Sequence, residues 1–370
     1  MSSLKSTRPK RISFMDFPNE KVLLISRLDG NRGPLGVAAA VHSRLAQNHA
    51  CKLAEVYSFA DVLKLIVKIP FTYKGYSICV HQNGFRVPMA LCMLSKIDHG
   101  NNYYLVVHGI AAEERKYRPV LSRDLKLEPK LIREFPNLIC VSRFEAEVLK
   151  KLYGRNENVT VIGNGVDLPV GVEVDSLLAE KRSSNPPVVI TTGGFEERKG
   201  CDLALLALSK YAALTDAQPR LIVCGRDSRA VGSNRALCEK MAREGGVELD
   251  YRGEISDKEE LMRLYRKADF YAGLSRFDTF NVSVLEGAAS CCIPIISEKC
   301  GASALFDGSN SIRCDIDEAD WADEAATSLV RLCSDNALYR EVASRSHAVA
   351  TANTWDAVAE RYWEVLSNDE

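Results

Sequence analysis

Residues 272–304 read AGLSRFDTFNVSVLEGAASCCIPIISEKCGASA, and this stretch decides the fold. An apolar run over 270–274 is typical of a buried strand, and a second run over 294–297 follows a segment, 281–290, with helical spacing. A strand, a polar loop, a helix and another strand in this order predict two neighbouring parallel strands. The polar loop then lies at the carboxyl end of the first strand, where open parallel sheets bind ligands.

The same alternation extends over most of the chain. Residues 169–187 lose it and end in SSNPP, which is typical of a linker. We therefore predict an α/β protein with two Rossmann-like, doubly wound domains at 1–168 and 188–354 that face an interdomain cleft, and a C-terminal helix at 355–370 that packs back toward the first domain. The expected strands are 21–27, 76–81, 103–108, 138–142, 159–162, 188–192, 221–224, 249–252, 270–274 and 294–297. The expected helices are 37–47, 88–97, 143–153, one from about 200, 235–243, 258–268, 281–290 and two final helices, the last at 355–366.

Composition sets the class of protein and reveals an asymmetry. The chain has 370 residues, 46% of them hydrophobic and 26% charged, which is the balance of a globular protein of two domains. Its net charge of −1 conceals a basic half, with 25 Lys and Arg against 15 Asp and Glu in residues 1–170, and an acidic half, with 23 against 34. Such a division predicts domains with different partners.

No apolar run is long enough for a transmembrane helix, and the N-terminus lacks the apolar segment of a secretory signal. Twelve cysteines occur without any Cys-x-x-Cys spacing, so we expect reduced thiols packed in a cytoplasmic protein rather than a zinc site.

The loop after the strand at 270–274 has the features of a diphosphate site. Thr279 is the expected N-cap, so the N–H groups of Phe280, Asn281 and Val282 would point at an anion. Glu286 lies seven residues beyond Thr279, on the same helix face and about 10 Å further along the axis. A nucleotide-diphosphate-sugar would fit with its sugar at Asp278 and its ribose at Glu286. The alternative is that Asp278 caps the helix and Glu286 is a solvated charge.

An ordered set of motifs resembles the retaining glycosyltransferases of family 4, which have the GT-B fold. Ser275, Asp278, Glu286-Gly287-Ala288-Ala289 and Pro294-Ile295 resemble the family's Glu-x7-Glu signature. Further matching pieces are Asn137–Ser142 with Tyr153-Gly154, Val161–Asp167, Gly193-Gly194 with Lys199-Gly200, Arg252-Gly253-Glu254, and Trp355-Asp356. The resemblance covers residues 20–366 and departs from the pattern in Asp278, where the family has Glu, in Gly194, where it often has Arg, and in Cys292, where it has Gly.

The resemblance implies a role for each candidate residue. Asp278, Lys199, Arg198 and His108 are the catalytic candidates: Lys199 and Arg198 would neutralise the leaving diphosphate, and His108 would contact the donor sugar. The structural alternatives are a solvated cationic loop for Lys199 and Arg198, and a satisfied histidine under a loop for His108; His81 is assigned to structure. The donor-binding candidates are Gly33, Gly36, Gly194, Arg198, Lys199, Arg226, Gly253, Glu254, Ile255, Phe280, Asn281, Val282 and Glu286.

The implied function is retaining transfer of a hexose from a nucleotide-sugar, with a UDP-sugar favoured over a GDP-sugar. The acceptor would be a saccharide or lipid-linked saccharide, in bacterial surface polysaccharide or lipopolysaccharide assembly. No cofactor or metal is expected, because Asp315-Ile316-Asp317 is explained as the acidic start of a helix. A nucleotide-sugar epimerase, a phosphorylase, and a catalytically impaired nucleotide-sugar-binding subunit remain alternatives.

The basic half leaves a membrane question open. Residues 62–69 (VLKLIVKI) with Lys74, together with Lys5, Arg8, Lys10 and Arg11, could rest on the anionic inner face of a membrane. The alternative is an ordinary half-buried helix and a tail. Nucleic acid is not expected as a partner, because no binding motif is present.

Overall fold

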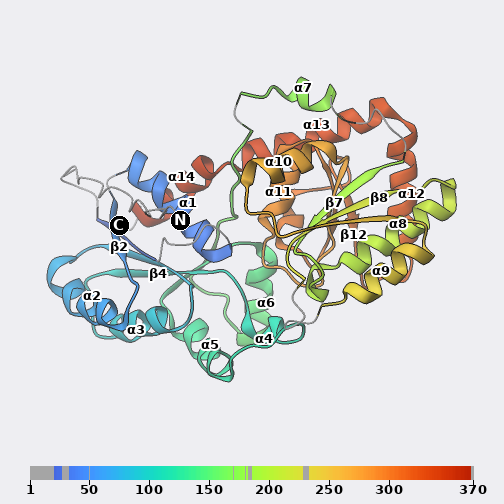
Figure 1. The fold of residues 1–370 in the computed structure, drawn as a ribbon. Coiled ribbons are helices and arrows are strands. Elements are labelled where there is room, and N and C mark those ends of the chain that lie inside the picture. The colour runs from blue at the N-terminus through green and yellow to red at the C-terminus, as the bar shows by residue number, and fades with distance from the viewer. Residues whose placement is uncertain are drawn as a thin grey trace, which may run out of the picture.

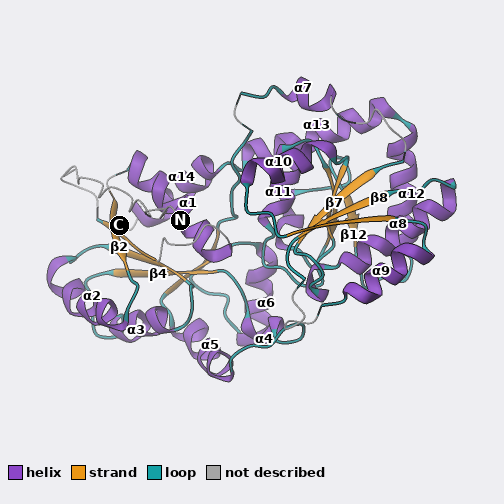
Figure 2. Cartoon of the chain, in the orientation of Figure 1, coloured by secondary structure: helices purple, strands orange, loops and turns teal. Residues whose placement is uncertain are grey.

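The computed structural model describes residues 21–26, 33–49, 51–169, 171–179, 181, 186–227 and 233–367. They form two α/β domains side by side, each with a six-stranded, all-parallel sheet between helices (Figures 1 and 2). The predicted fold class, two Rossmann-like doubly wound domains, is confirmed.

The N-terminal sheet has the strand order β2-β1-β3-β4-β5-β6. Its central strands are buried on both faces, which is why they read as continuous apolar runs in the sequence. The strands are β1 (Val22–Ser26), β2 (Cys51–Glu55), β3 (Ser77–His81), β4 (Asn102–Val107), β5 (Asn137–Cys140) and β6 (Val159–Val161). The helices are α1 (Gly33–Asn48), α2 (Phe59–Thr72), α3 (Arg86–Leu94), α4 (Ala111–Glu114), α5 (Ser122–Glu134) and α6 (Arg143–Tyr153).

The C-terminal sheet has the order β12-β11-β10-β7-β8-β9. Its strands are β7 (Val188–Thr192), β8 (Arg220–Cys224), β9 (Glu248–Gly253), β10 (Phe270–Gly273), β11 (Ile293–Ser297) and β12 (Ile312–Cys314). The helical elements are α7 (Val174–Ala179), η1 (Glu197–Lys199), α8 (Cys201–Thr215), α9 (Arg235–Glu244), α10 (Lys258–Lys267), α11 (Val282–Ala289), η3 (Gly301–Leu305), α12 (Trp321–Ser334), α13 (Asn336–Ala352) and α14 (Trp355–Ser367).

Two sequence expectations about the elements are wrong. Three helices rather than two follow the last strand, because Asp335 ends α12 and at the same time caps α13 by accepting a hydrogen bond from the N–H of Leu338 at 3.0 Å. Helix α11 begins at Val282 rather than near Phe280. The short edge strands β2 and β12 escaped prediction, because edge strands carry little of the apolar signal that marks buried ones. The helices α4 and α5 and the helix α7, which lies within the expected linker, were not predicted either.

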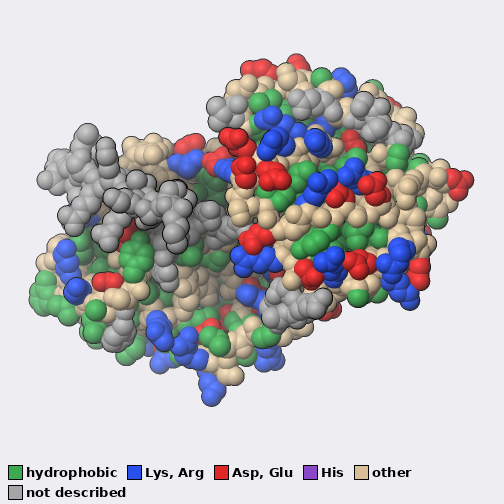
Figure 3. All heavy atoms as spheres, in the orientation of Figure 1, with side chains coloured by type: hydrophobic (Ala, Val, Ile, Leu, Met, Phe, Trp, Pro, Cys, Tyr) green, Lys and Arg blue, Asp and Glu red, His purple; other side chains and the backbone are tan. Residues whose placement is uncertain are grey.

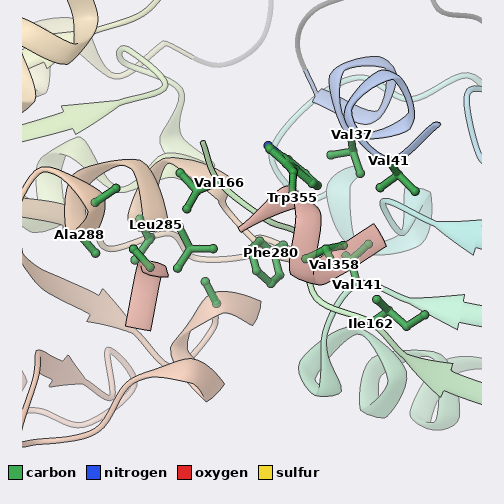
Figure 4. Packing of buried hydrophobic residues seen from close by; sticks show 14 of the residues in the cluster. Val37, Val41, Val141, Ile162, Val166, Phe280, Leu285, Ala288, Trp355 and Val358 are labelled. Carbon is green, nitrogen blue, oxygen red and sulfur yellow. The ribbon is translucent and has the colours of Figure 1, made fainter. Parts of the chain in front are cut away.

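One hydrophobic cluster joins the two domains (Figure 4). Phe280 of the C-terminal domain reaches toward the N-terminal domain, where a Cβ on Gly163 would lie 3.1 Å from its ring. The chain returns to the first domain after α13: Trp355 donates its N–H to the carbonyl of Val166 at 3.2 Å, and α14 packs on α1 (Figure 1). The ring of Trp363 on α14 stacks on His49 at the end of α1, with the ring centroids 4.2 Å apart.

All twelve cysteines are free, and eleven of them are buried. Within the described ranges, no helix has both the length and the apolar character needed to cross a membrane.

Candidate active site

A cleft of about 700 Å³ lies between the domains. The carboxyl ends of the parallel strands of both sheets open toward it, so polar loop residues of both domains form its walls. The predicted residues that line it are Gly33, Gly36, His108, Lys199, Arg226, Glu254, Ile255, Asp278, Phe280, Asn281, Val282 and Glu286. Three predicted residues do not line it: Gly194, Arg198 and Gly253.

Lys199 and Asp278 form an ion pair on the wall of the cleft, with 2.6 Å between Nζ and Oδ2. Asp278 is only 8% exposed. Burial raises the pKa of its carboxyl, but the charges of Lys199 and then Arg198 outweigh that effect, so the net pKa is lowered and the group is a carboxylate at neutral pH. This part of the wall therefore holds one anion next to a cation that faces the cavity.

Arg198 lies behind this pair rather than on the wall of the cleft. Its guanidinium is 3.8 Å from Asp278, donates to the carbonyl of Phe277 at 2.8 Å and pairs with Glu196 at 2.9 Å. Arg198 thus holds Asp278 and its loop in place, and no direct contact with a ligand in the cleft follows from its position.

Gly194 has no room for a side chain. Its φ is +63°, and a Cβ there would lie 2.1 Å from the carbonyl oxygen of Arg226. Its N–H donates to the carbonyl of Cys224 at 2.9 Å, which holds the loop against the end of β8. The close approach of two backbone loops therefore explains why glycine stands at position 194 rather than arginine. The neighbouring Gly193 and Gly225 lie on the wall of the cleft.

The expected N-cap at Thr279 is wrong. Its hydroxyl donates instead to the carbonyl of His108, at 2.9 Å, and links the two domains. The N–H of Phe280, expected to face an anion, donates to Oδ1 of Asp278 at 3.3 Å. Asn281, with φ +69°, is the residue that precedes the helix, and its side chain makes no capping hydrogen bond.

The start of α11 still presents backbone donors to the cleft. The N–H groups of Asn281, Val282 and Ser283 have no acceptor among the described residues, and all three residues line the cavity. Three such donors at a helix N-terminus favour an anion there. The predicted anion site is shifted by one residue along the chain.

Glu286 lies on the wall of the cleft one turn into α11. It is half-buried, burial raises the pKa of its carboxyl, and the hydroxyl of Tyr265 donates to it at 3.0 Å. The small residues after it do pack closely, since a Cβ on Gly287 would lie 2.8 Å from Cβ of Tyr271. Glu286 is therefore not a solvated surface charge.

Three histidines run from the cleft into the N-terminal domain. His108 follows β4 and lines the cavity, and its Nε2 is 2.8 Å from Nδ1 of His81 at the end of β3. The ring of His42 on α1 meets His81 edge-on at 4.9 Å. Burial lowers the pKa of His42 and of His108 to about 3, and it lowers the pKa of His81 well below its usual value, so all three are neutral at pH 7. The contact with Nδ1 of His81 fixes the ring orientation of His108, whereas Nε2 of His81 has no partner among the described residues.

Sequence reasoning missed residues at the junction of the domains. Asp167, quoted only as part of a motif, pairs with Arg44 of α1 at 2.6 Å and with Lys258 of α10 at 2.7 Å, so it bridges both domains at the rim of the cleft. Asn164 is 5% exposed and also lines the cleft, and its Oδ1 has no partner in the described part of the chain. Their spacing within Asn-Gly-Val-Asp was the available signal.

The remaining donor-binding candidates lie on the wall of the cleft that the C-terminal domain forms. Arg226 is exposed and pairs with Glu254, and Ile255 lies beside them. Among the described residues, no cluster of three or more His, Cys, Asp or Glu is arranged to hold a metal ion. Asp317 pairs with Lys299 at 2.5 Å, and its N–H donates to Asp315 at 3.2 Å, so the Asp-x-Asp sequence is accounted for by local contacts.

Two family models match this chain. Residues 56–169 match Glycosyltransferase Family 4, and residues 177–345 match Glycosyl transferases group 1. The D-inositol 3-phosphate glycosyltransferase of Mycolicibacterium smegmatis is 26% identical over 253 residues, which are 65% of this chain and 56% of that protein. The GDP-mannose:cellobiosyl-diphosphopolyprenol alpha-mannosyltransferase of Xanthomonas campestris is 24% identical over 59% of this chain and 55% of its own. The chain thus spans about half the length of these relatives.

Solved structures share the whole architecture. HepE of Anabaena, solved with UDP and glucose, has a TM-score of 0.68 at 16% identity and covers 95% of this chain and 100% of its own. The sucrose-phosphate synthase of Thermosynechococcus elongatus has a TM-score of 0.69 at 16% identity, covering 94% and 98%. These similarities show that the fold is GT-B.

Proposed function

Because the chain belongs to the group 1 and family 4 glycosyltransferases of GT-B fold, we propose that it transfers a hexose from a nucleotide-diphosphate-sugar to a saccharide or lipid-linked saccharide. One observation carries the proposal. The lining of the cleft contains the Lys199–Asp278 pair just before α11, free N–H groups at the start of that helix and Glu286 one turn into it, a series of groups that suits a sugar, a diphosphate and a ribose.

The proposed donor pose gives each residue a task. Lys199 and the N–H groups of Asn281 and Val282 bind the diphosphate, and Glu286 accepts hydrogen bonds from the ribose hydroxyls. Asp278 accepts hydrogen bonds from the sugar, and neutral His108 contacts the sugar from the N-terminal side. Arg198 acts through Asp278, whose carboxylate it keeps ionised and in place.

We propose a retaining reaction that needs no metal. The bond between the anomeric carbon and the diphosphate oxygen breaks, with its electron pair leaving on the nucleoside diphosphate. The acceptor oxygen bonds to the same face of the anomeric carbon, and its proton goes to an oxygen of the departing phosphate. Lys199 and the helix N-terminus stabilise the charge that develops there.

UDP is the favoured nucleotide and a bacterial surface glycan the favoured product class. HepE, which shares this fold, is solved with UDP and with UDP-glucose, and the Xanthomonas relative by its name acts on a polyprenol-linked saccharide. A cytoplasmic location, at the inner face of a membrane where such an acceptor is presented, agrees with the twelve free cysteines.

A screen for stabilisation by nucleotide-sugars, followed by turnover, tests the proposal. A ligand present at 100 times its Kd raises the free energy of unfolding by about 2.7 kcal/mol. The best UDP-sugar is then incubated with the wild type, Asp278→Ala, Glu286→Ala and a matched control, Glu364→Ala, which removes an exposed carboxylate on α14. We expect UDP release by the wild type and the control, unchanged by EDTA, and at least 100-fold less in the two site variants.

Other outcomes identify the alternatives. Conversion of the donor sugar without UDP release indicates an epimerase, and dependence on inorganic phosphate indicates a phosphorylase. Tight binding without turnover, with a full set of acceptors, indicates a binding subunit. Intact turnover in both site variants contradicts the site itself.

A further inference from the structure

Helix α2 carries an apolar stripe on its outer face. Leu63, Val67 and Phe71 are 50%, 66% and 86% exposed. Residues four apart in a helix lie one above the other, so these three side chains form a single row. We call this row, together with Lys64 and Lys68, the α2 face.

The helix does not need this row in order to fold. Val62, Leu65 and Ile69 point the other way and are at most 8% exposed within the core of the N-terminal domain. The start of the helix is fixed by a capping box, in which Ser58 and Asp61 each bond to the other's backbone N–H. Three large apolar side chains in water are therefore not a by-product of core packing.

Positive charge flanks the row. Lys64 comes directly after Leu63 and Lys68 directly after Val67, so the two lysines lie beside the row. Lys74 comes two residues after the end of the helix. Within the described chain, none of these three ammonium groups forms an ion pair, whereas Lys68 lies over the ring of Tyr73, 5.4 Å from its centroid. Figure 3 shows the hydrophobic atoms at the lower-left edge of the molecule, over α2, with Lys and Arg atoms beside them.

The position of the α2 face relates it to the cleft. Helix α2 begins four residues after β2 ends, at the same edge of the parallel sheet as His81 and His108. Helix α3, which packs beside α2, adds the exposed residue Met93, and the turn after α3 adds the exposed Ile97. A surface bound along α2 would thus lie on the domain that faces the acceptor side of the cleft.

We propose that the α2 face docks on an anionic lipid bilayer and presents the cleft to a membrane-bound acceptor. The apolar row would enter the boundary between headgroups and acyl chains, while the lysines contact anionic headgroups. Apolar row and basic flank together match a bilayer, since a nucleic acid would use the lysines but not the row. The proposal rests on the proposed transferase function only for the identity of the acceptor.

Flotation of the full chain with vesicles tests the docking. Vesicles of phosphatidylcholine alone are compared with vesicles containing 30% phosphatidylglycerol, at low and high salt. One variant pair, Val67→Ser with Phe71→Ser, removes the two most exposed side chains of the row, and a second pair, Lys64→Gln with Lys68→Gln, removes the charge. The matched control is Leu214→Ser with Leu237→Ser, which are 61% and 49% exposed on the other domain.

We expect binding only to the anionic vesicles, weakened by salt. The partition coefficient should fall about fivefold for each lysine removed, from a contribution of about 1 kcal/mol per basic residue. It should fall by about tenfold or more when the row is removed and stay unchanged in the control. UDP binding should be the same in all four proteins, which separates this test from that of the donor site.

Three results overturn the proposal. They are absence of binding to anionic vesicles, equal binding by the row variant and the wild type, and an equal loss in the control pair. A wild-type dimer in sedimentation that the row variant converts to a monomer assigns the α2 face to a second copy of the chain instead.

Discussion

Two carboxylates in one cleft have pKa values shifted in opposite directions. The pKa of Asp278 is lowered because Lys199 and Arg198 outweigh its burial. The pKa of Glu286 is raised because burial outweighs the hydroxyl of Tyr265 and the charge of Lys258. Asp278 is therefore held as an anion before any ligand arrives. Glu286 is suited to accept hydrogen bonds from neutral hydroxyls, which satisfy a buried carboxylate without another charge.

His42 gives a prediction about pH. Its ring is 1% exposed, neither nitrogen has a partner among the described residues, and burial followed by the charge of His108 lowers its pKa to about 3. Below pH 6.5 the unfolded chain protonates His42 and the folded chain does not, so His42 alone lowers the free energy of unfolding by about 1.4 kcal/mol per pH unit, in addition to the effect of His81 and His108. The stability of His42→Leu relative to the wild type should thus rise by about 2 kcal/mol between pH 7.5 and pH 5.

Urea unfolding at the two pH values measures this difference. The exposed His99 supplies the control, since His99→Leu should leave the pH dependence as it is in the wild type. If wild type and His42→Leu lose stability in parallel as the pH falls, His42 is protonated in the folded protein and the account of the cluster is wrong.

At the scale of elements, the loop between β7 and α8 is fixed by backbone contact. Replacement of Gly194 by alanine would put a methyl group 2.1 Å from the carbonyl oxygen of Arg226, at a φ of +63°. Gly154, at the end of α6, has a similar φ of +70° but nothing within 4 Å of its Cβ position. Gly154→Ala therefore measures the conformational cost alone.

We expect Gly154→Ala to lower the free energy of unfolding by about 1 kcal/mol and Gly194→Ala by about 2–4 kcal/mol. Gly194→Ala should also weaken UDP binding, because the displaced loop carries Lys199. Thermal unfolding and calorimetric titration measure the two effects. Equal destabilisation by both substitutions would mean that the two loops can separate at no cost.

The sequence allowed the central elements to be predicted and left the edges uncertain. Buried parallel strands such as β7 and β10 are continuous apolar runs, which is a strong local signal. The start of α11 was misplaced because Thr279, a good cap by its chemistry, is recruited by His108 of the other domain. No local pattern contains that contact.

The same limit applied to the site. The residues that one motif brings together, from Asp278 to Glu286, were predicted to share a site and do line one cleft. Arg198 was expected on the wall, but only the fold shows that it lies behind Asp278, and the bridge from Arg44 through Asp167 to Lys258 joins residues far apart in the sequence.

At the scale of the molecule, the division of charge acquires a physical explanation. In the proposed function the acidic C-terminal half binds an anion, at the place where Lys199 and the start of α11 set the local potential. The basic half carries the α2 face. A hydrophobic cluster that includes Phe280 and residues of both domains (Figure 4) joins the two halves.

The central claim is that the cleft binds a nucleotide-sugar with the sugar at Asp278 and the ribose at Glu286. Calorimetric titration with UDP and with the best UDP-sugar, in Glu286→Gln and Asp278→Asn, tests it most directly. The account predicts that Glu286→Gln raises both Kd values by the same factor, about tenfold, since both ligands contain the ribose. It predicts that Asp278→Asn removes the preference for the UDP-sugar over UDP. Unchanged binding of both ligands in Glu286→Gln, or a preference that survives in Asp278→Asn, would contradict the account.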